Sequence, residues 1–261
     1  MSDRLRIEIT DGIADVRLDR ADKHNAIDRA MFEAIADAIE QLAGVDGLRV
    51  VVLSGEGPSF CAGLDVQGFT AGPEAIEGLL QRDSDGLNLA QRVCIGWQRL
   101  PVPVIAAIHG KTYGGGLQIA LGADIRLLAP DAELSVMEIR WGLIPDMGIS
   151  QTLRQLVSMD VAKELTFTGR SIDAGEAVRL GLGAGIAESP YEAAMDLAKE
   201  ICSRSPQAVH AAKKLFNESW LADEPTGLEL ETELQRRLLF SPDQIEAVRA
   251  NFEKRNPVWK S

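Results

Sequence analysis

Two glycine-containing segments could do chemistry with their backbone N–H groups. The first is Ser59–Asp65 (SFCAGLD) and the second is Ile108–Gln118 (IHGKTYGGGLQ). Glycine allows unusual backbone angles and the close approach of a ligand to the main chain. A helix that starts just after Gly115 would direct free N–H groups at a bound group, and two such donors converging on one oxygen form an oxyanion hole. Alternatively, the glycines only pack a turn against a neighbouring element.

The elements that position these segments begin with a predicted hairpin and a helix. Leu5–Thr10 and Ile13–Asp19 alternate between apolar and polar residues on either side of Asp11–Gly12, a pair typical of a tight hairpin turn. Asp28 can cap a helix that ends at Gly44. The apolar residues of that helix recur at helical spacing and are Met31, Ile35, Ile39 and Leu42.

Continuous apolar runs predict strands that are buried on both faces. Arg49–Ser54 (RVVVLS) is the first of them, and a loop over 55–63 and a polar, glycine-containing stretch follow it. The elements predicted next are the helix Leu87–Leu100, the strand Val102–Ile108, the helix Leu117–Gly122 and the strand Ile125–Leu128.

The composition changes at about Met195, beyond which the strand signals vanish. Three helical segments are predicted near and after this point, with Pro206 and Pro225 as breaks: Ala193–Ser203, Pro206–Leu221 and Thr226–Leu239. The sequence therefore predicts an α/β core over residues 1–195 and a helical C-terminal region over residues 196–261.

Charge restricts the classes of ligand. The 261 residues are 46% hydrophobic and 25% charged, as in an average globular protein, and the net charge is −12. Nucleic acid and anionic membrane both require a basic surface, so this charge argues against either partner. A small anionic ligand stays possible because it needs only a few local cations.

The cysteines and the N-terminus indicate a reducing compartment. Cys61, Cys94 and Cys202 are widely spaced and odd in number, which favours reduced core residues over disulfides or metal ligands. The N-terminus leads into an alternating pattern instead of a signal peptide, and no window approaches the ~18 apolar residues of a membrane span. We therefore expect a soluble, cytoplasmic protein.

Six short motifs together resemble the crotonase (enoyl-CoA hydratase/isomerase) superfamily, nearly from end to end. Each motif is weak alone, but their order and spacing are specific. They are Asp22–Ala26 (DKHNA), Phe60–Asp65 (FCAGLD), His109–Gly116 (HGKTYGGG), Glu138–Pro145 (EIRWGLIP), Leu165–Arg170 (LTFTGR) and Glu253–Arg255 (EKR).

The resemblance implies a core of repeated ββα units wound as a superhelix and a C-terminal helical region that trimerises, giving trimers or dimers of trimers. The implied ligand is an acyl-CoA thioester, and coenzyme A is part of that substrate, so neither a cofactor nor a metal ion is expected. The thioester carbonyl would lie between the N–H groups of Leu64 and Gly115, where an enolate-like anion is stabilised.

Coenzyme A contacts are also implied. Lys23 and His24 match positions that meet its phosphates or ribose, and Ala26 and Ala62 match backbone contacts near the pantetheine and adenine. The alternative for Lys23 is a solvated loop cation. Lys254 matches a basic residue that reaches the coenzyme A of a neighbouring subunit, although the aromatic residue that the family has three places earlier is Asn251 here. By family position, the segment from Asp65 to Asn88 borders the acyl pocket and Trp141 forms its wall.

The acidic side chains distinguish among the activities of the family. Hydratases carry two glutamates, of which this chain has Gln118 at the first position and Glu138 at the second. A neutral amide can hydrogen-bond a substrate or a water but cannot usefully exchange a proton. Glu138 is therefore predicted to be the acid/base, and simple hydration lacks one of its two acids.

Asp146 supplies a second acid near Glu138. Dienoyl-CoA isomerases have a catalytic aspartate at this place, and aryl-CoA dehalogenases have a nucleophilic one. The plainer alternative is a turn residue after a proline. An acyl pocket that desolvated both carboxyls would raise their pKa values.

Three functions remain open at this point. The first is an enoyl-CoA hydratase/isomerase that moves a proton through Glu138 with Asp146, and isomerisation tolerates Gln118 best. The second is hydrolytic or dehalogenating chemistry through an Asp146 ester. The third is a protein that binds CoA ligands without turnover. RNA binding, known in some family members, is disfavoured by the net charge of −12.

Overall fold

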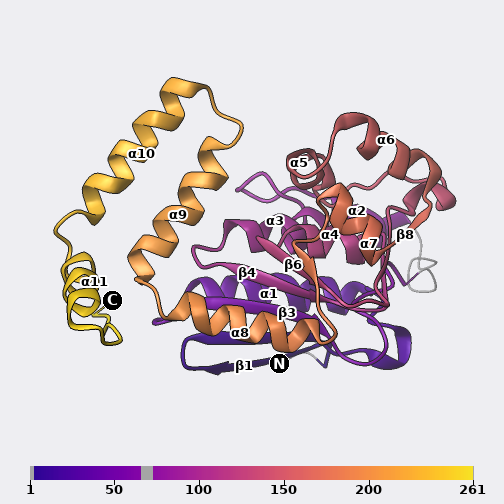
Figure 1. The fold of residues 1–261 in the computed structure, drawn as a ribbon. Coiled ribbons are helices and arrows are strands. Elements are labelled where there is room, and N and C mark those ends of the chain that lie inside the picture. The colour runs from indigo at the N-terminus through magenta and orange to yellow at the C-terminus, as the bar shows by residue number, and fades with distance from the viewer. Residues whose placement is uncertain (1–2, 66–72, 261) are drawn as a thin grey trace.

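The computed structural model describes residues 3–65 and 73–260. Figure 1 shows a layered α/β core and, at its side, a helical arm formed by the C-terminal segment. No helix within these residues is long and apolar enough to cross a bilayer.

The predicted hairpin and helix are confirmed. β1 (Leu5–Thr10) pairs antiparallel with β2 (Ile13–Leu18), and both turn residues Asp11 and Gly12 have positive φ, which a tight hairpin turn requires. The Asp28 side chain accepts a hydrogen bond from the Met31 N–H at 2.8 Å and caps α1 (Arg29–Ala43). The helix ends at Gly44, and its predicted apolar residues are buried.

A six-stranded sheet forms the centre of the core, in the order β1-β2-β3-β4-β6-β9. Its other strands are β3 (Val50–Gly55), β4 (Val104–Ile108), β6 (Ile125–Leu128) and β9 (Gly185–Ile186), and all pairs after β1–β2 are parallel. Successive β3 residues face opposite sides: Val51 packs into the main core, whereas Val52 packs with Ala194 and Ala198 of α8 (Pro190–Cys202). The prediction of burial on both faces is confirmed.

The chain also forms a second, three-stranded sheet in the order β5-β7-β8. This sheet consists of β5 (Lys111–Tyr113), β7 (Glu133–Ser135) and β8 (Ser171–Asp173). β4 leads into β5 and β6 leads into β7, so these two turns of the chain contribute first to the large sheet and then to the small one, whereas β8 of the small sheet precedes β9 of the large one. After β3, Cys61 continues this pattern through a parallel bridge to Thr112.

Helices and short helical turns connect and cover these strands. They are η1 (Ala21–Lys23), α2 (Pro73–Leu80), α3 (Leu89–Arg99), α4 (Gly115–Leu121), η3 (Glu138–Trp141), α5 (Ile149–Thr152), η4 (Leu153–Gln155), α6 (Met159–Thr168) and α7 (Ala174–Leu180).

The arm consists of α9 (Pro206–Ser219), α10 (Glu224–Leu238) and α11 (Pro242–Glu253). The sequence predicted the first two but not α11. α9 is anchored to the core by the buried Lys213, whose ammonium lies 2.8 Å from the Asp124 carboxylate and donates to the Trp97 and Val102 carbonyls. The proposed boundary after residue 195 falls inside α8, which packs on the sheet, and the domain division stays a prediction.

Candidate active site

The two glycine-containing segments lie side by side. The Phe60 N–H donates to the His109 carbonyl at 2.8 Å, and the Cys61 N–H donates to the Lys111 carbonyl at 3.2 Å. The Tyr113 N–H returns a bond to the Cys61 carbonyl at 3.0 Å. This short ladder fixes the position of each segment relative to the other.

Glycines let the two main chains touch. A Cβ on Gly116 would lie 2.3 Å from the Cys61 carbonyl oxygen, and a Cβ on Gly63 would lie 2.8 Å from the Tyr113 carbonyl oxygen and 3.8 Å from the Gly115 nitrogen. α4 begins at Gly115, and Leu64 follows Gly63 on the facing segment. Within the described part of the chain, neither the Leu64 N–H nor the Gly115 N–H has a hydrogen-bond acceptor. The two predicted donors are therefore brought together.

Asn25 organises the first segment. Its side-chain amide nitrogen, fully buried, donates to the carbonyls of Glu56, Ser59 and Phe60 at 2.9, 2.8 and 3.1 Å. Its side-chain oxygen accepts from the Arg20 N–H at 2.8 Å. From sequence, Asn25 was identified only as part of a motif. A signal was present, because asparagine tolerates the left-handed backbone (φ 55) that this turn requires.

Gln118 connects the acid Glu138 to the loop that carries Asp146. Its amide nitrogen donates to Glu138 Oε1 at 2.7 Å, and its amide oxygen accepts from the Met147 N–H at 2.9 Å. Gln118 and Glu138 are 2% and 7% exposed, respectively, so both hydrogen bonds are shielded from solvent. The structure thus groups Gln118, Glu138 and the Asp146–Met147 loop.

The second carboxyl oxygen of Glu138, Oε2, is buried and has no hydrogen-bond partner among the described residues. Burial raises the pKa of Glu138, the neighbouring charge of Asp146 raises it further, and the hydrogen bond from Gln118 opposes the rise. Burial of the carboxyl also raises the pKa of Asp146, although the residue as a whole is exposed. Both directions agree with the sequence-based prediction.

Apolar atoms surround the Gly115 end of the site. A Cβ on Gly115 would lie 2.9 Å from the Met147 sulfur and 3.0 Å from Cδ1 of Ile27, and both side chains are buried. Gly114 lies beside Glu138, because a Cβ there would be 3.3 Å from Oε1. The arrangement provides two backbone donors, a carboxyl with one free oxygen, and a low-dielectric setting that strengthens interactions with developing charge.

Comparison with known proteins identifies the family. The model of the enoyl-CoA hydratase/isomerase family matches residues 8–261. The chain belongs to this family. The resemblance to the crotonase superfamily is confirmed, and the chain is an acyl-CoA enzyme of the hydratase/isomerase type.

Individual members of the family support the same assignment. A probable mitochondrial enoyl-CoA hydratase 2 of Arabidopsis thaliana is 34% identical over 95% of this chain and 81% of its own length. Mouse methylglutaconyl-CoA hydratase is 32% identical over 99% of this chain and 84% of its own. The crystal structure of an enoyl-CoA hydratase from Bacillus anthracis superposes with a TM-score of 0.90 at 30% identity, covering 98% and 99% of the two chains. The predicted α/β spiral fold with a helical C-terminal region is thereby confirmed.

Four residues that the family resemblance assigns to coenzyme A contacts are exposed or half-buried. Lys23 is exposed in η1, whereas His24, Ala26 and Ala62 are half-buried. The Ala62 N–H donates to the His24 carbonyl at 2.9 Å, which joins their two segments. His24 Nδ1 lies 2.9 Å from Ser59 Oγ, and this hydrogen bond orients the imidazole ring.

The remaining family-assigned residues are more dispersed. Asp65 forms an ion pair with Arg20 at 2.8 Å. Trp141 lies on η3 and is 61% exposed. Lys254 caps α11 in the arm, and Figure 1 shows this helix well apart from the core elements of the site. Residues 66–72 of the segment expected to border the acyl pocket lie outside the described residues.

The cysteines take no evident part in the site chemistry. All three are free thiols; Cys61 and Cys94 are buried, and Cys202 is half-buried. Burial raises the pKa of the Cys61 thiol to about 12, so it stays protonated at neutral pH. Within residues 3–65 and 73–260, no group of histidine, cysteine and carboxylate side chains is arranged to hold a metal ion.

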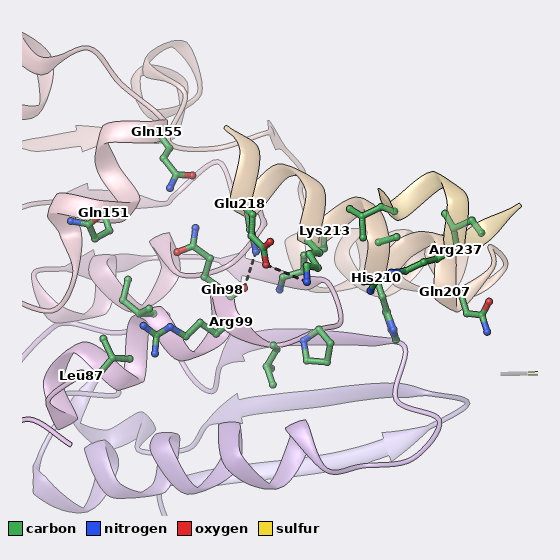
Figure 2. A pocket seen from close by; sticks show the side chains of 18 of the residues that line it. Leu87, Gln98, Arg99, Gln151, Gln155, Gln207, His210, Lys213, Glu218 and Arg237 are labelled. Carbon is green, nitrogen blue, oxygen red and sulfur yellow. Dashed lines mark hydrogen bonds and ion pairs between the residues drawn. The ribbon is translucent and has the colours of Figure 1, made fainter. Parts of the chain in front are cut away.

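A large cavity lies elsewhere, between the core and the arm. It has a volume of about 1090 Å³, and Gln98, Gln151 and Gln155 of the core face His210 of α9 and Arg237 of α10 across it (Figure 2). None of the residues predicted for catalysis lines this cavity.

Proposed function

We propose that this enzyme moves a proton on an acyl-CoA thioester, with Glu138 as the acid/base and the N–H groups of Leu64 and Gly115 as an oxyanion hole. The observation that carries the proposal is the free, buried Oε2 of Glu138, whose carboxyl lies beside Gly114, together with two backbone donors that have no acceptor in the described structure. Burying a carboxylate oxygen without a hydrogen-bond partner costs free energy. In the proposed reaction this oxygen accepts the proton of a C–H group placed against it.

The proton transfer follows from general chemistry. Ionised Glu138 takes a proton from the carbon next to the thioester carbonyl; the C–H bond breaks and an O–H bond forms. The electron pair moves onto the carbonyl oxygen, where the N–H groups of Leu64 and Gly115 stabilise the negative charge. In an ester with a β,γ-double bond, protonated Glu138 then returns the proton to the γ-carbon, the electron pair of the anion reforms the carbonyl, and the double bond moves to the α,β position as the carboxylate is regenerated.

Isomerisation fits the side chains better than hydration. Hydration needs a second group that activates water, and Gln118 stands where the hydratases of this family have an acid. Asp146 is the only other acid that the structure relates to Glu138 among the described residues, because its charge raises the Glu138 pKa. We therefore include Asp146 as a second proton-transfer group.

Coenzyme A would extend outward from the thioester. We assign its contacts to Lys23, His24, Ala26 and Ala62 of the same chain, and to Lys254 of a neighbouring copy. The decisive experiment is turnover of a panel of enoyl-, dienoyl- and aryl-CoA esters, with mass spectrometry of the products. A shifted double bond without added mass supports isomerisation, added water supports hydration, and no turnover of any ester contradicts the proposal.

We expect Asp146→Asn to reduce turnover of the best ester by about 10²-fold or more, because the proton path loses one end. An Asp146 nucleophile behaves differently: single turnover in ¹⁸O-labelled water would place the label in the Asp146 carboxylate. Asp37→Asn, at an exposed position of α1 away from the site, is the matched control. Full activity of Asp146→Asn on every ester would return Asp146 to the role of a turn residue.

We also propose that the arm mediates assembly into a homotrimer or a dimer of trimers. Apolar side chains on it are strongly exposed in the single chain, including Trp220 at 62%, Phe240 at 83% and Phe252 at 86%. The double variant Phe240→Asp/Phe252→Asp should sediment as a monomer, whereas Ile9→Asp, at an exposed apolar residue of β1, should keep the wild-type assembly. A wild-type chain that sediments as a fully active monomer would contradict this assembly.

A further inference from the structure

Both the nitrogen and the oxygen of the Gln118 amide form hydrogen bonds within the protein. The nitrogen donates to Glu138 Oε1 and the oxygen accepts from the Met147 N–H, at 2.7 and 2.9 Å. These bonds leave only one orientation of the amide, because an oxygen cannot donate to Glu138 and an NH₂ group cannot accept from Met147. The side chain is 2% exposed, so solvent does not compete for either bond.

We infer that Gln118 is a positioning residue, which fixes Glu138 and the Met147 backbone relative to each other and leaves Oε2 of Glu138 as the oxygen that exchanges the proton. This inference rests on the proposed function and adds to it. Gln118 then acts through its two partners and makes no chemical step of its own.

The hydrogen bonding of the Glu138 carboxyl shows why a positioning residue is important here. Oε1 receives the Gln118 hydrogen bond while Oε2 receives none within the described structure. Without Gln118, Oε1 would lose the hydrogen bond that distinguishes it from Oε2, and the carboxyl would lose a contact that fixes its orientation. A proton-transfer group that is displaced by about 1 Å can lose about 10²-fold in rate, so a fixed carboxyl contributes directly to turnover.

The same amide also fixes the other side of the site. The Met147 sulfur packs against Gly115, one of the two proposed oxyanion donors. Because Gln118 hydrogen-bonds both Glu138 and the Met147 N–H, it fixes the position of the base relative to the Met147 side chain that packs against Gly115. Base and oxyanion hole are thus held as one unit, which suits a reaction in which one carboxyl removes and returns the proton.

Gln118→Met tests this role, because methionine has a similar size and makes neither hydrogen bond. We expect kcat to fall between about 10-fold and 10²-fold with KM nearly unchanged. The acidic limb of the kcat–pH profile should move to higher pH, since the bond that favours ionised Glu138 is lost. Gln155→Met, at a glutamine facing the cavity between core and arm, should leave kcat and the pH profile unchanged.

Hydrogen exchange of the Met147 amide supplies a second measurement that is independent of turnover. Exchange should be faster in Gln118→Met and remain slow in Gln118→Glu, whose carboxylate can still accept the Met147 N–H. In Gln118→Glu the acidic limb should also move upward, because two adjacent carboxyls resist ionising together. If Gln118→Met does not fold, these two results for Gln118→Glu decide the matter.

An unchanged acidic limb and an unchanged kcat in the folded variants would overturn the inference. The proposed function has a separate test in Glu138→Gln. If Glu138→Gln is inactive while Gln118→Met resembles the wild type, only the role of Gln118 fails. If Glu138→Gln is fully active, the proposed function itself fails.

Discussion

Replacing Glu138 with glutamine should lower kcat for the best CoA ester by about 10² to 10⁴-fold, the range expected for a general acid/base. The substitution keeps the size of the side chain and can still accept the Gln118 hydrogen bond through its amide oxygen, so the Met147 loop should stay in place. Turnover is lost because the amide cannot take up the proton. The affinity for a CoA ligand should remain nearly unchanged, because the size of the side chain and its hydrogen bond are kept.

The pH dependence gives this variant a second readout. Wild-type turnover should decline as the pH falls through the raised pKa of Glu138, since only the ionised carboxylate can accept the proton. Residual activity of Glu138→Gln should lack that acidic limb. Steady-state kinetics and calorimetric titration with a CoA ligand measure both quantities, with the exposed Glu188→Gln as the control. Undiminished turnover in Glu138→Gln would show that the residue is structural.

Gly116→Ala should have the second large effect, although Gly116 bears no reactive group. A Cβ at this position would lie 2.3 Å from the Cys61 carbonyl oxygen and 2.8 Å from the Cys61 sulfur, so the two segments must move apart. Leu64 and Gly115 would then no longer converge on one oxygen. Loss of an oxyanion donor typically costs about 10² to 10³-fold in kcat, and we expect a loss of that order.

The matched control for Gly116→Ala is Gly185→Ala, where an added Cβ meets no atom within 4 Å. Affinity for free coenzyme A, which has no thioester carbonyl, should persist in Gly116→Ala and so report that the protein is folded. Wild-type kcat/KM in Gly116→Ala would mean that the contact between the segments is not needed for catalysis.

Local chemistry made much of the fold predictable from sequence. The Asp28 cap, the Gly44 end of α1 and the apolar run of β3 each depend on interactions within a few residues or on a simple burial pattern. The short strands β5 and β7 have three residues each, too few to show any periodicity, and they form only because distant segments pair with them. α11 did carry a local signal, Ser241 before Pro242, that the sequence analysis overlooked.

The candidate site was also predictable only in part. Residue types and family motifs indicated Glu138, Gln118 and the two backbone donors, and the structure places these groups close together. The partners of each group were not predictable, because they depend on side-chain geometry across the spiral. The two hydrogen bonds of Gln118 and the three donated by the Asn25 amide are the clearest instances.

The bridge between Cys61 and Thr112 has a consequence for how the enzyme is made. It joins segments from different turns of the spiral, and pairings between distant parts of a chain close slowly during folding. The chain emerges from the ribosome N-terminus first, so Leu64 is made well before Gly115 and before the Met147 loop that packs on Gly115. A partly synthesised chain that ends before Met147 therefore lacks part of the proposed site, which can be complete only after Met147 has been made and folded against Gly115.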